Sequence, residues 1–179
     1  MVKEVEQVPA WFRPVARRLL AREARAYQAL AGLCGVPRLL ARHPDRILLS
    51  FVAGVPLPSL PAPGPDERLF DALESLLSEV HARGVACADL HHRNVIVDAS
   101  GRPHLVDFAL AVTSQRPGWL FRRMAELDRG AALRMRLRYL RRAPTTAERD
   151  RLKAGGGLWR AGRAVKRLLG ALRRAPDIS

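Results

Sequence analysis

Hydrophobic residues recur at helical spacing in two segments of the chain. In residues 16–33 apolar positions fall every three or four residues, and a glycine and a proline follow, which predicts a helix. Residues 66–83 show the same period up to Gly84, and Asp66 stands where an N-cap is expected. The apolar face of this second helix is formed by Leu69, Phe70, Leu73, Leu76, Leu77 and Val80.

Short apolar runs predict strands between and after these helices. They cover residues 47–52, 94–98 and 104–107, and turn-forming residues separate the last two. A proline-rich segment, 56–65, predicts a hinge between the first strand and the second helix.

The last third of the chain is predicted to be helical. Thr145 follows a proline and precedes Glu148 by three residues, which is the pattern of a capping box at a helix start. Three glycines, 155–157, would end this helix. A final helix over 158–174 would carry leucines on one side and arginines on much of the rest.

Charge is divided unevenly along the sequence. The net charge is +14, and residues 116–179 hold 18 basic and 5 acidic side chains, against 13 and 12 in residues 1–115. The first two thirds therefore have the composition of an ordinary globular body. The basic last third indicates a surface that meets negative charge.

The bulk composition excludes several classes of protein. With 179 residues and 48% hydrophobic side chains the chain suits one domain or two small lobes. Two cysteines, Cys34 and Cys87, cannot form a disulfide framework. The start lacks the apolar region of a signal peptide, and no stretch is long and apolar enough to span a bilayer. We expect a cytoplasmic protein, with a peripheral position at the inner face of the membrane as the second possibility.

Three polar residues stand at the ends of the predicted strands. Asp89 and Asn94 lie five apart in a polar loop that leads directly into an apolar strand. Asp107 ends the next strand and is followed by Phe108. In phosphoryl transfer one carboxylate accepts a proton from the attacking hydroxyl, while an amide oxygen and a second carboxylate hold Mg²⁺ against the nucleotide phosphates. The residue types and their order fit that chemistry.

With these residues the chain resembles the protein-kinase-like superfamily. The resemblance implies that Asp89 is the catalytic base and that Asn94 and Asp107 hold Mg²⁺ beside ATP. The sequence Asp-Leu-His-His-Arg-Asn that begins at Asp89 is most similar to bacterial lipopolysaccharide (Kdo/heptose) kinases and small bacterial serine/threonine-kinase-like proteins. It implies a catalytic position for His91, near the γ-phosphate.

The same resemblance implies a pair of residues that positions the ATP phosphates. Glu23, on the first predicted helix, stands where the kinase αC glutamate would be, and Lys3 lies twenty residues earlier. Lys3 would be the strand lysine that holds the α- and β-phosphates. It is the only lysine before Lys153 in an arginine-rich chain, so its identity carries weight.

The chain departs from the kinase pattern in several places. The Gly-rich loop and its two strands, expected before Lys3, are absent from the sequence. Either the true protein starts earlier or the lobe is truncated. Because an uncovered sheet edge is usually avoided, we expect a longer true protein or another chain segment that covers this edge. Cys87 replaces the usual histidine, and Ala109 replaces the glycine after Phe108. No Ala-Pro-Glu follows, which argues against a peptide acceptor.

We therefore expect an α+β, protein-kinase-like bilobal fold with a truncated N-lobe and a helical C-lobe. The predicted divisions are a reduced N-lobe over 1–55, a hinge over 56–65, a C-lobe core over 66–142 and basic C-terminal helices over 143–179. The implied activity is ATP- and Mg²⁺-dependent transfer of the γ-phosphate to a hydroxyl. The acceptor would be a lipopolysaccharide-type sugar or a protein serine or threonine.

Two further interpretations remain at this point. The chain could be a catalytically weak pseudokinase or adaptor that uses its basic helices to bind an anionic membrane or partner, helped by Trp119, Leu120, Phe121 and Trp159. Nucleic acid ranks last as a partner because aromatic residues are scarce and no nucleic-acid motif is present.

A zinc site is not expected, because the spacing of Cys87, His91 and His92 matches no common zinc pattern.

Overall fold

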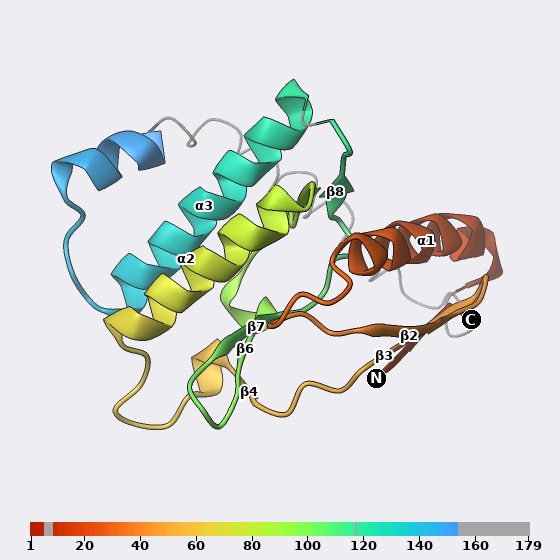
Figure 1. Cartoon of the computed structure of the whole chain (residues 1–179), viewed down its shortest axis with the longest axis horizontal. Helices are drawn as coiled ribbons and strands as arrows, with labels where there is room; N and C mark the ends of the chain where they lie inside the picture. The colour runs from red at the N-terminus through yellow and green to blue at the C-terminus, as the bar shows by residue number, and fades with distance from the viewer. Residues whose placement is uncertain (6–8, 117, 154–179) are drawn as a thin grey trace, which may run out of the picture. The chain divides into compact units, whose positions relative to one another are not determined.

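The N-terminal part of the chain forms a three-stranded antiparallel sheet with one helix against it. The strands are β1 (Val2–Glu4), β2 (Leu39–Arg42) and β3 (Arg46–Leu49), and β3 lies between the other two. Alternate residues of β3 are buried, as expected for a sheet with one covered face. The helix α1 (Arg13–Ala29) contacts β2 and β3 and lies along the sheet in Figure 1.

The structure is a computed structural model that describes residues 1–5, 9–116 and 118–153. Residues 1–142 form one compact unit and residues 143–179 a second. The predicted N-lobe, hinge and C-lobe core all belong to the first unit.

Two long helices pack against each other in the second half of this unit. They are α2 (Glu67–Ala82) and α3 (Trp119–Tyr139). All six apolar residues predicted for the face of α2 are buried, and the side chain of Asp66 accepts a hydrogen bond from the backbone N–H of Leu69 at 2.9 Å. Arg136 of α3 forms ion pairs with three carboxylates of α2, those of Glu67, Asp71 and Glu74.

A second, small sheet is formed by strands from both sides of α2 in the sequence. Its strands are β4 (Val55–Pro56), β6 (Val95–Val97) and β7 (Pro103–Leu105), with β6 in the middle. A further two-stranded pair joins β5 (Val85–Ala86) to β8 (Val112–Thr113). Three short 3-10 helices complete the unit: η1 (Ala10–Phe12), η2 (Leu57–Ser59) and η3 (His92–Asn94).

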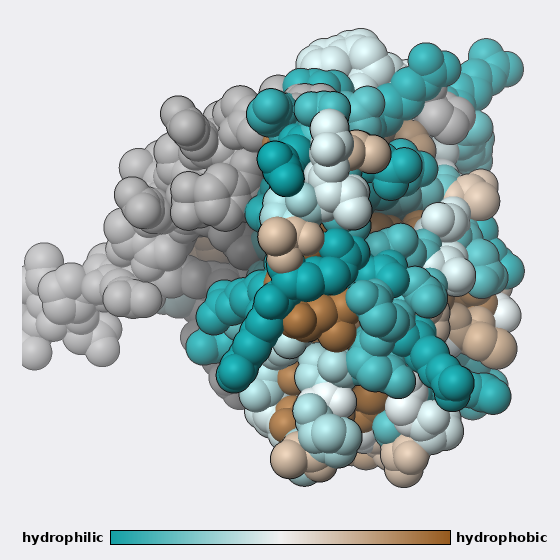
Figure 2. Space-filling view, turned by 90° about the vertical axis from the view of Figure 1, so that its left-hand side faces the viewer, coloured by the Kyte–Doolittle hydropathy of each residue, from teal (hydrophilic) through white to brown (hydrophobic). Residues whose placement is uncertain are grey.

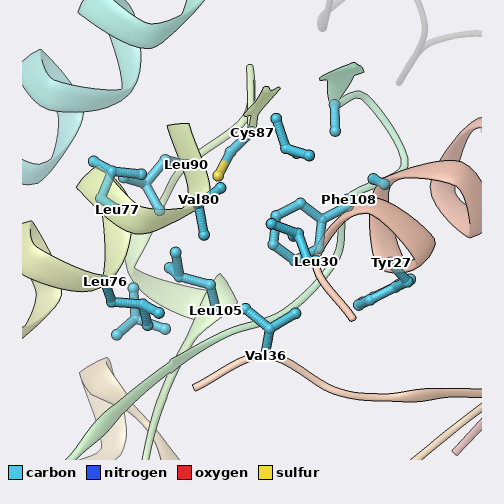
Figure 3. Close-up of a cluster of buried hydrophobic side chains, with 14 of the residues drawn as sticks. Tyr27, Leu30, Val36, Leu76, Leu77, Val80, Cys87, Leu90, Leu105 and Phe108 are labelled. Carbon is cyan, nitrogen blue, oxygen red and sulfur yellow. The ribbon is translucent and has the colours of Figure 1, made fainter. Parts of the chain in front are cut away.

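A large hydrophobic core joins most of these elements. Figure 3 shows Tyr27 of α1, Val80 of α2 and Leu105 of β7 among its side chains, with Phe108 close to Tyr27. The rings of Tyr27 and Phe108 meet edge to face with their centroids 5.2 Å apart, a favourable aromatic geometry. The residue after Asp107 is therefore held in the core by the helix that carries Glu23.

The predicted elements agree with the observed ones except at their boundaries. The first helix begins three residues earlier than predicted, because Pro14 is tolerated in the first turn. It ends at Ala29, so Leu30 and Leu33 are buried core residues outside the helix. The strand predicted over 47–52 covers Arg46–Leu49.

The second unit is described only over its first residues. Residues 146–153 are helical, and the backbone N–H of Thr145 donates to Glu148 while the backbone N–H of Glu148 donates to the Thr145 hydroxyl. The predicted capping box is confirmed. The glycines 155–157, Trp159 and the helix predicted over 158–174 lie outside the described residues.

Among the residues that Figure 2 colours, hydrophilic side chains predominate, with hydrophobic residues visible between them. Trp119 and Leu120 are exposed at the start of α3. Phe121, which was expected beside them on a membrane-facing surface, is instead buried and packs with Ala86 and Ala125, so that expectation was wrong. In the part of the chain that the structure describes, each helix is too short or too polar to cross a membrane.

Candidate functional site

Lys3 bridges two carboxylates that are far apart in the sequence. Its Nζ donates to Glu23 Oε1 at 2.6 Å and to Asp107 Oδ1 at 2.9 Å. These three residues come from the middle of β1, the middle of α1 and the segment just after β7. The structure therefore brings together three of the four residues that the resemblance had assigned to phosphate positioning and metal binding.

The position of each residue follows from its element. In β1 the side chains alternate, and Lys3 is less exposed than its neighbours Val2 and Glu4. Because α1 packs on the sheet, Glu23 on its covered face is only 2% exposed. Asp107 has φ of 67°, a left-handed conformation that is uncommon for a residue other than glycine, so the chain turns sharply here.

The electrostatics of the three groups are coupled. Burial alone would lower the pKa of Lys3, but the adjacent Glu23 and Asp107 outweigh burial and raise it, so the lysine stays protonated. Burial raises the pKa of Glu23 against the opposing effect of Lys3. Burial would also raise the pKa of Asp107, but the charge and hydrogen bond of Lys3 outweigh it and hold this pKa below its usual range. Asp107 is therefore an ionised carboxylate, and its side chain is 47% exposed.

Asn94 connects the loop of Asp89 to the segment of Asp107. Its Nδ2 donates to the backbone oxygen of Asp89 at 3.3 Å, and its backbone oxygen accepts from the N–H of Val106 at 3.0 Å. The antiparallel pairing of β6 with β7 places Asn94 opposite Val106, one residue before Asp107. The two predicted metal-binding residues thus lie at the same end of one hairpin.

The two histidines of the loop have different surroundings. The Nδ1 of His91 accepts from the backbone N–H of Arg93 at 3.2 Å, which turns this ring within its own loop. His91 also lies near enough to Asp107 to favour the ionised carboxylate. The Nδ1 of His92 instead pairs with the hydroxyl of Tyr139 at 3.0 Å. His92 thus links this loop to the last residue of α3.

A buried carboxylate holds the start of the loop. Asp128 of α3 is 1% exposed, and it accepts from the backbone N–H groups of Cys87 at 2.7 Å and Ala88 at 3.0 Å. It also pairs with His81 of α2 at 3.0 Å. Ala88 has a left-handed φ of 59°, so the same hydrogen bonds that satisfy Asp128 hold a strained turn directly before Asp89.

Sequence reasoning missed Asp128 and Tyr139. Both lie on the covered side of α3, at positions spaced by three and four residues from the buried Ala125, Ala132 and Met135. An aspartate in the middle of such an apolar stripe was the available signal, because a charge is rarely placed there without partners. Tyr27 of α1 also acts on the site, because its hydroxyl accepts from the backbone N–H of Asp107 at 3.2 Å.

The residues present fit a magnesium–nucleotide complex. Asp107 and Asn94 offer a carboxylate and an amide oxygen, the hard ligands that Mg²⁺ prefers when nucleotide phosphates supply the rest. Lys3 Nζ binds Oδ1 of Asp107, and the backbone N–H of Ala109 also donates to this carboxylate. Among residues 1–5, 9–116 and 118–153, no group of three or more histidine, cysteine, aspartate or glutamate side chains could hold a metal without such help. Cys87 is buried, and burial raises the pKa of its thiol, so it is a packing residue.

Comparison with known proteins gives a match in structure and not in sequence. No protein-family model matches the chain, and no curated protein matches it. Two crystal structures of the Rio2 kinase from Chaetomium thermophilum are similar, one of them a complex with ADP, Mg²⁺ and phosphoaspartate. The complex has a TM-score of 0.62 at 19% identity, and the other structure 0.60 at 20%. The chain has a protein-kinase-like fold.

The similarity covers most of this chain and about half of each Rio2 chain. The matches cover 86% and 85% of this chain but 49% and 50% of the Rio2 chains, so the chain spans about half their length. At this level of identity the comparison establishes the fold alone. The expected kinase-like α+β architecture is confirmed.

Proposed function

We propose that the protein is an ATP- and Mg²⁺-dependent phosphotransferase that transfers the γ-phosphate to a hydroxyl group. The observation that carries the proposal is the contact of Lys3 with both Glu23 and Asp107, which comes from three separate elements of a kinase-like fold. An ordinary surface lysine has no need of two carboxylates that orient it. A lysine that holds phosphates beside a metal-binding carboxylate must be oriented in this way.

Each residue has a role in this reaction. Glu23 orients Lys3, whose ammonium group binds phosphate oxygens and moves away from Asp107 as the nucleotide enters. Asp89 accepts the proton of the acceptor hydroxyl and orients its oxygen for attack. His91 donates a hydrogen bond toward the γ-phosphate, since its Nδ1 already accepts one from Arg93. Asn94 and Asp107 would hold Mg²⁺, which when bound neutralises charge on the phosphates.

Nucleotide binding provides the first test. Mg²⁺–ATP at millimolar concentration should raise the melting temperature of the full chain, because a ligand that binds only the folded state stabilises it. Asp107→Ala should abolish both this shift and ATP turnover. Asp45→Ala removes a similarly exposed aspartate, 40% against 47%, and should preserve both. If the unmodified protein shows no shift at millimolar Mg²⁺–ATP, the proposal fails.

The acceptor is proposed to be a sugar hydroxyl on a lipopolysaccharide-type molecule. The loop that begins at Asp89 supports this class, and the basic last third of the chain suits an anionic surface at the inner face of the membrane. A protein serine or threonine is the second acceptor to test. Transfer of ³²P from ATP to purified lipopolysaccharide core, compared with transfer to a mixed protein substrate, separates the two.

A second candidate function is that of a catalytically weak adaptor. It is favoured by the 18 basic residues of the last third and by the exposed Trp119 and Leu120 at the start of α3. Arginines beside an exposed tryptophan are typical of surfaces that bind anionic membranes. Binding to anionic liposomes that weakens with salt and disappears on truncation after Gly157 would support it. Binding that ignores both would rule it out.

A further inference from the structure

A groove of about 1020 Å³ lies away from the residues assigned to phosphoryl transfer. Four segments of the first unit line it: the turn after α1, the segment 50–53 after β3, the outer side of α2, and the turn between β6 and β7. None of Lys3, Glu23, Asp89, Asn94 and Asp107 contributes to its lining. Its volume is that of a site for a small molecule.

The groove combines an apolar floor with charged residues. Buried residues from three of the segments form the floor, Leu33, Leu76 and Pro103 among them. Phe51 also lines it and is 80% exposed, so it adds accessible apolar surface to the groove. An apolar ligand body would cover this surface and remove it from water.

The charges of the lining differ in whether they already have partners. Asp98 is saturated, because it accepts from the backbone and hydroxyl of Ser100, from the backbone of Arg102 and from His104. Arg38 and Arg102 are exposed, and neither guanidinium forms an ion pair with another residue that the structure describes. Glu79 is the one other carboxylate in the lining. Two unpaired guanidinium groups beside an apolar floor complement an anion with an apolar body.

We propose that this groove binds a small amphipathic anion, with an aryl or alkyl body on the floor and a carboxylate or phosphate head at Arg38 and Arg102. The negative charge of Glu79 repels the anionic head group and so lowers the affinity of the groove for the anion. Guanidinium groups bind carboxylates and phosphates alike, so the head groups are distinguished by experiment.

The groove is connected to the phosphoryl-transfer site through two elements. The turn after α1 continues the helix of Glu23, and the β6–β7 turn closes the hairpin whose other end holds Asn94 and Asp107. Three residues per strand separate the two ends of the hairpin, or roughly 10 Å. A ligand in the groove would therefore change the affinity for nucleotide. This second step rests on the proposed function, whereas binding in the groove does not.

Calorimetry with matched naphthalene compounds tests the binding. We expect 2-naphthoate or 2-naphthyl phosphate to bind at least tenfold more tightly than the neutral 2-naphthamide, and the two anions identify the preferred head group. The double variant Arg38→Gln/Arg102→Gln should remove this preference and retain weak binding of the amide. Glu79→Gln should strengthen binding of the anions. Equal binding of all three compounds, or none at millimolar concentration, overturns the proposal.

Two substitutions on α2 locate the site. Ser75 lines the groove and is exposed, so Ser75→Trp should fill the groove and abolish binding of all three compounds. Ser78→Trp places the same side chain at an exposed position of the same helix outside the groove and should leave binding unchanged. Binding that survives Ser75→Trp overturns the proposal.

The exposed Cys34 in the lining gives an independent readout. Bound naphthoate should slow its reaction with a thiol reagent severalfold, while the buried Cys87 is unreactive in both states. An unchanged rate at saturating naphthoate places the ligand elsewhere and overturns the proposal. An altered affinity for Mg²⁺–ATP in the presence of naphthoate supports the coupling. An unchanged affinity, with binding to the groove intact, overturns the coupling alone.

Discussion

Asp128 accepts a hydrogen bond from the backbone N–H of Cys87 at 2.7 Å, although the two residues are 41 positions apart. The same carboxylate binds the next N–H, so α3 fixes the backbone directly before Asp89. Eleven residues further along α3, Tyr139 binds His92 within the same loop. One helix therefore holds the loop on both sides of Asp89, at Cys87 and Ala88 before it and at His92 after it.

Asp128→Ala should destabilise the protein by about 3 kcal/mol, because it leaves two backbone N–H groups without their acceptor in a buried place. Asp128→Asn keeps one acceptor oxygen, so its loss of stability should be clearly smaller than that of Asp128→Ala. Urea unfolding monitored by circular dichroism measures both variants. An equal loss in the two variants would mean that the hydrogen bonds do not carry the effect.

Tyr139→Phe should lower the turnover number clearly and the free energy of unfolding only slightly. The substitution removes one hydrogen bond, to His92, and keeps the ring that lies 6.3 Å from the ring of Phe70. The expected loss of stability is about 1 kcal/mol. The lost hydrogen bond loosens the loop that carries Asp89 and Asn94 and leaves Lys3 and Glu23 in place. We therefore expect kcat to fall severalfold and the KM for ATP to change little. A fall in stability with unchanged kcat would show that the contact is structural only.

Much of the fold could be predicted because its helices have strong apolar periodicity. The helix predicted over 66–83 is within one residue of α2 at either end, since Asp66 caps it and Gly84 follows it. β2 was not predicted, and β4, β5 and β8 have only two residues each. Strands this short are stabilised by their tertiary partners, and their local sequence carries almost no signal.

The site was predicted from types and order of residues, and its geometry was not predictable. Lys3 and Asp107 are 104 positions apart, and only the packing of α1 on the sheet brings both to Glu23. The roles of Asp128 and Tyr139, which support the loop from α3, were not predicted because each acts through a tertiary contact. Asp128 alone left a trace, as a charge within an apolar stripe.

The stability of the β6–β7 turn should depend on acid pH through Asp98. Its pKa is lowered, first by the hydrogen bond with His104 and then by Ser100. A lowered pKa means that the stabilisation is present above the unfolded value of about 3.9 and is lost as the pH falls below it. Asp98→Asn should therefore cost about 1–2 kcal/mol at pH 7, and the difference from the unmodified protein should shrink below pH 4. Thermal unfolding between pH 7 and pH 2.5 measures this difference. A difference that stays constant with pH would contradict the assignment.

Gly84 should be the least tolerant of substitution among the glycines that the structure describes. It has φ of +72°, and a Cβ there would collide with the backbone oxygen of Ser114, in the segment just after β8. Gly84→Ala should destabilise the protein by at least about 2 kcal/mol, since neither backbone can yield without breaking the hydrogen bond from Ser114 N–H to the Gly84 oxygen. Gly32→Ala is the matched control, because Gly32 has nearly the same φ, +76°, with no atom near its Cβ position. Its cost should be about 1 kcal/mol, from backbone conformation alone. Similar losses in the two variants would show that the contact with Ser114 has no energetic role. A larger loss at Gly84 would locate the strain at the junction of α2 with β5, which leads into the loop of Asp89.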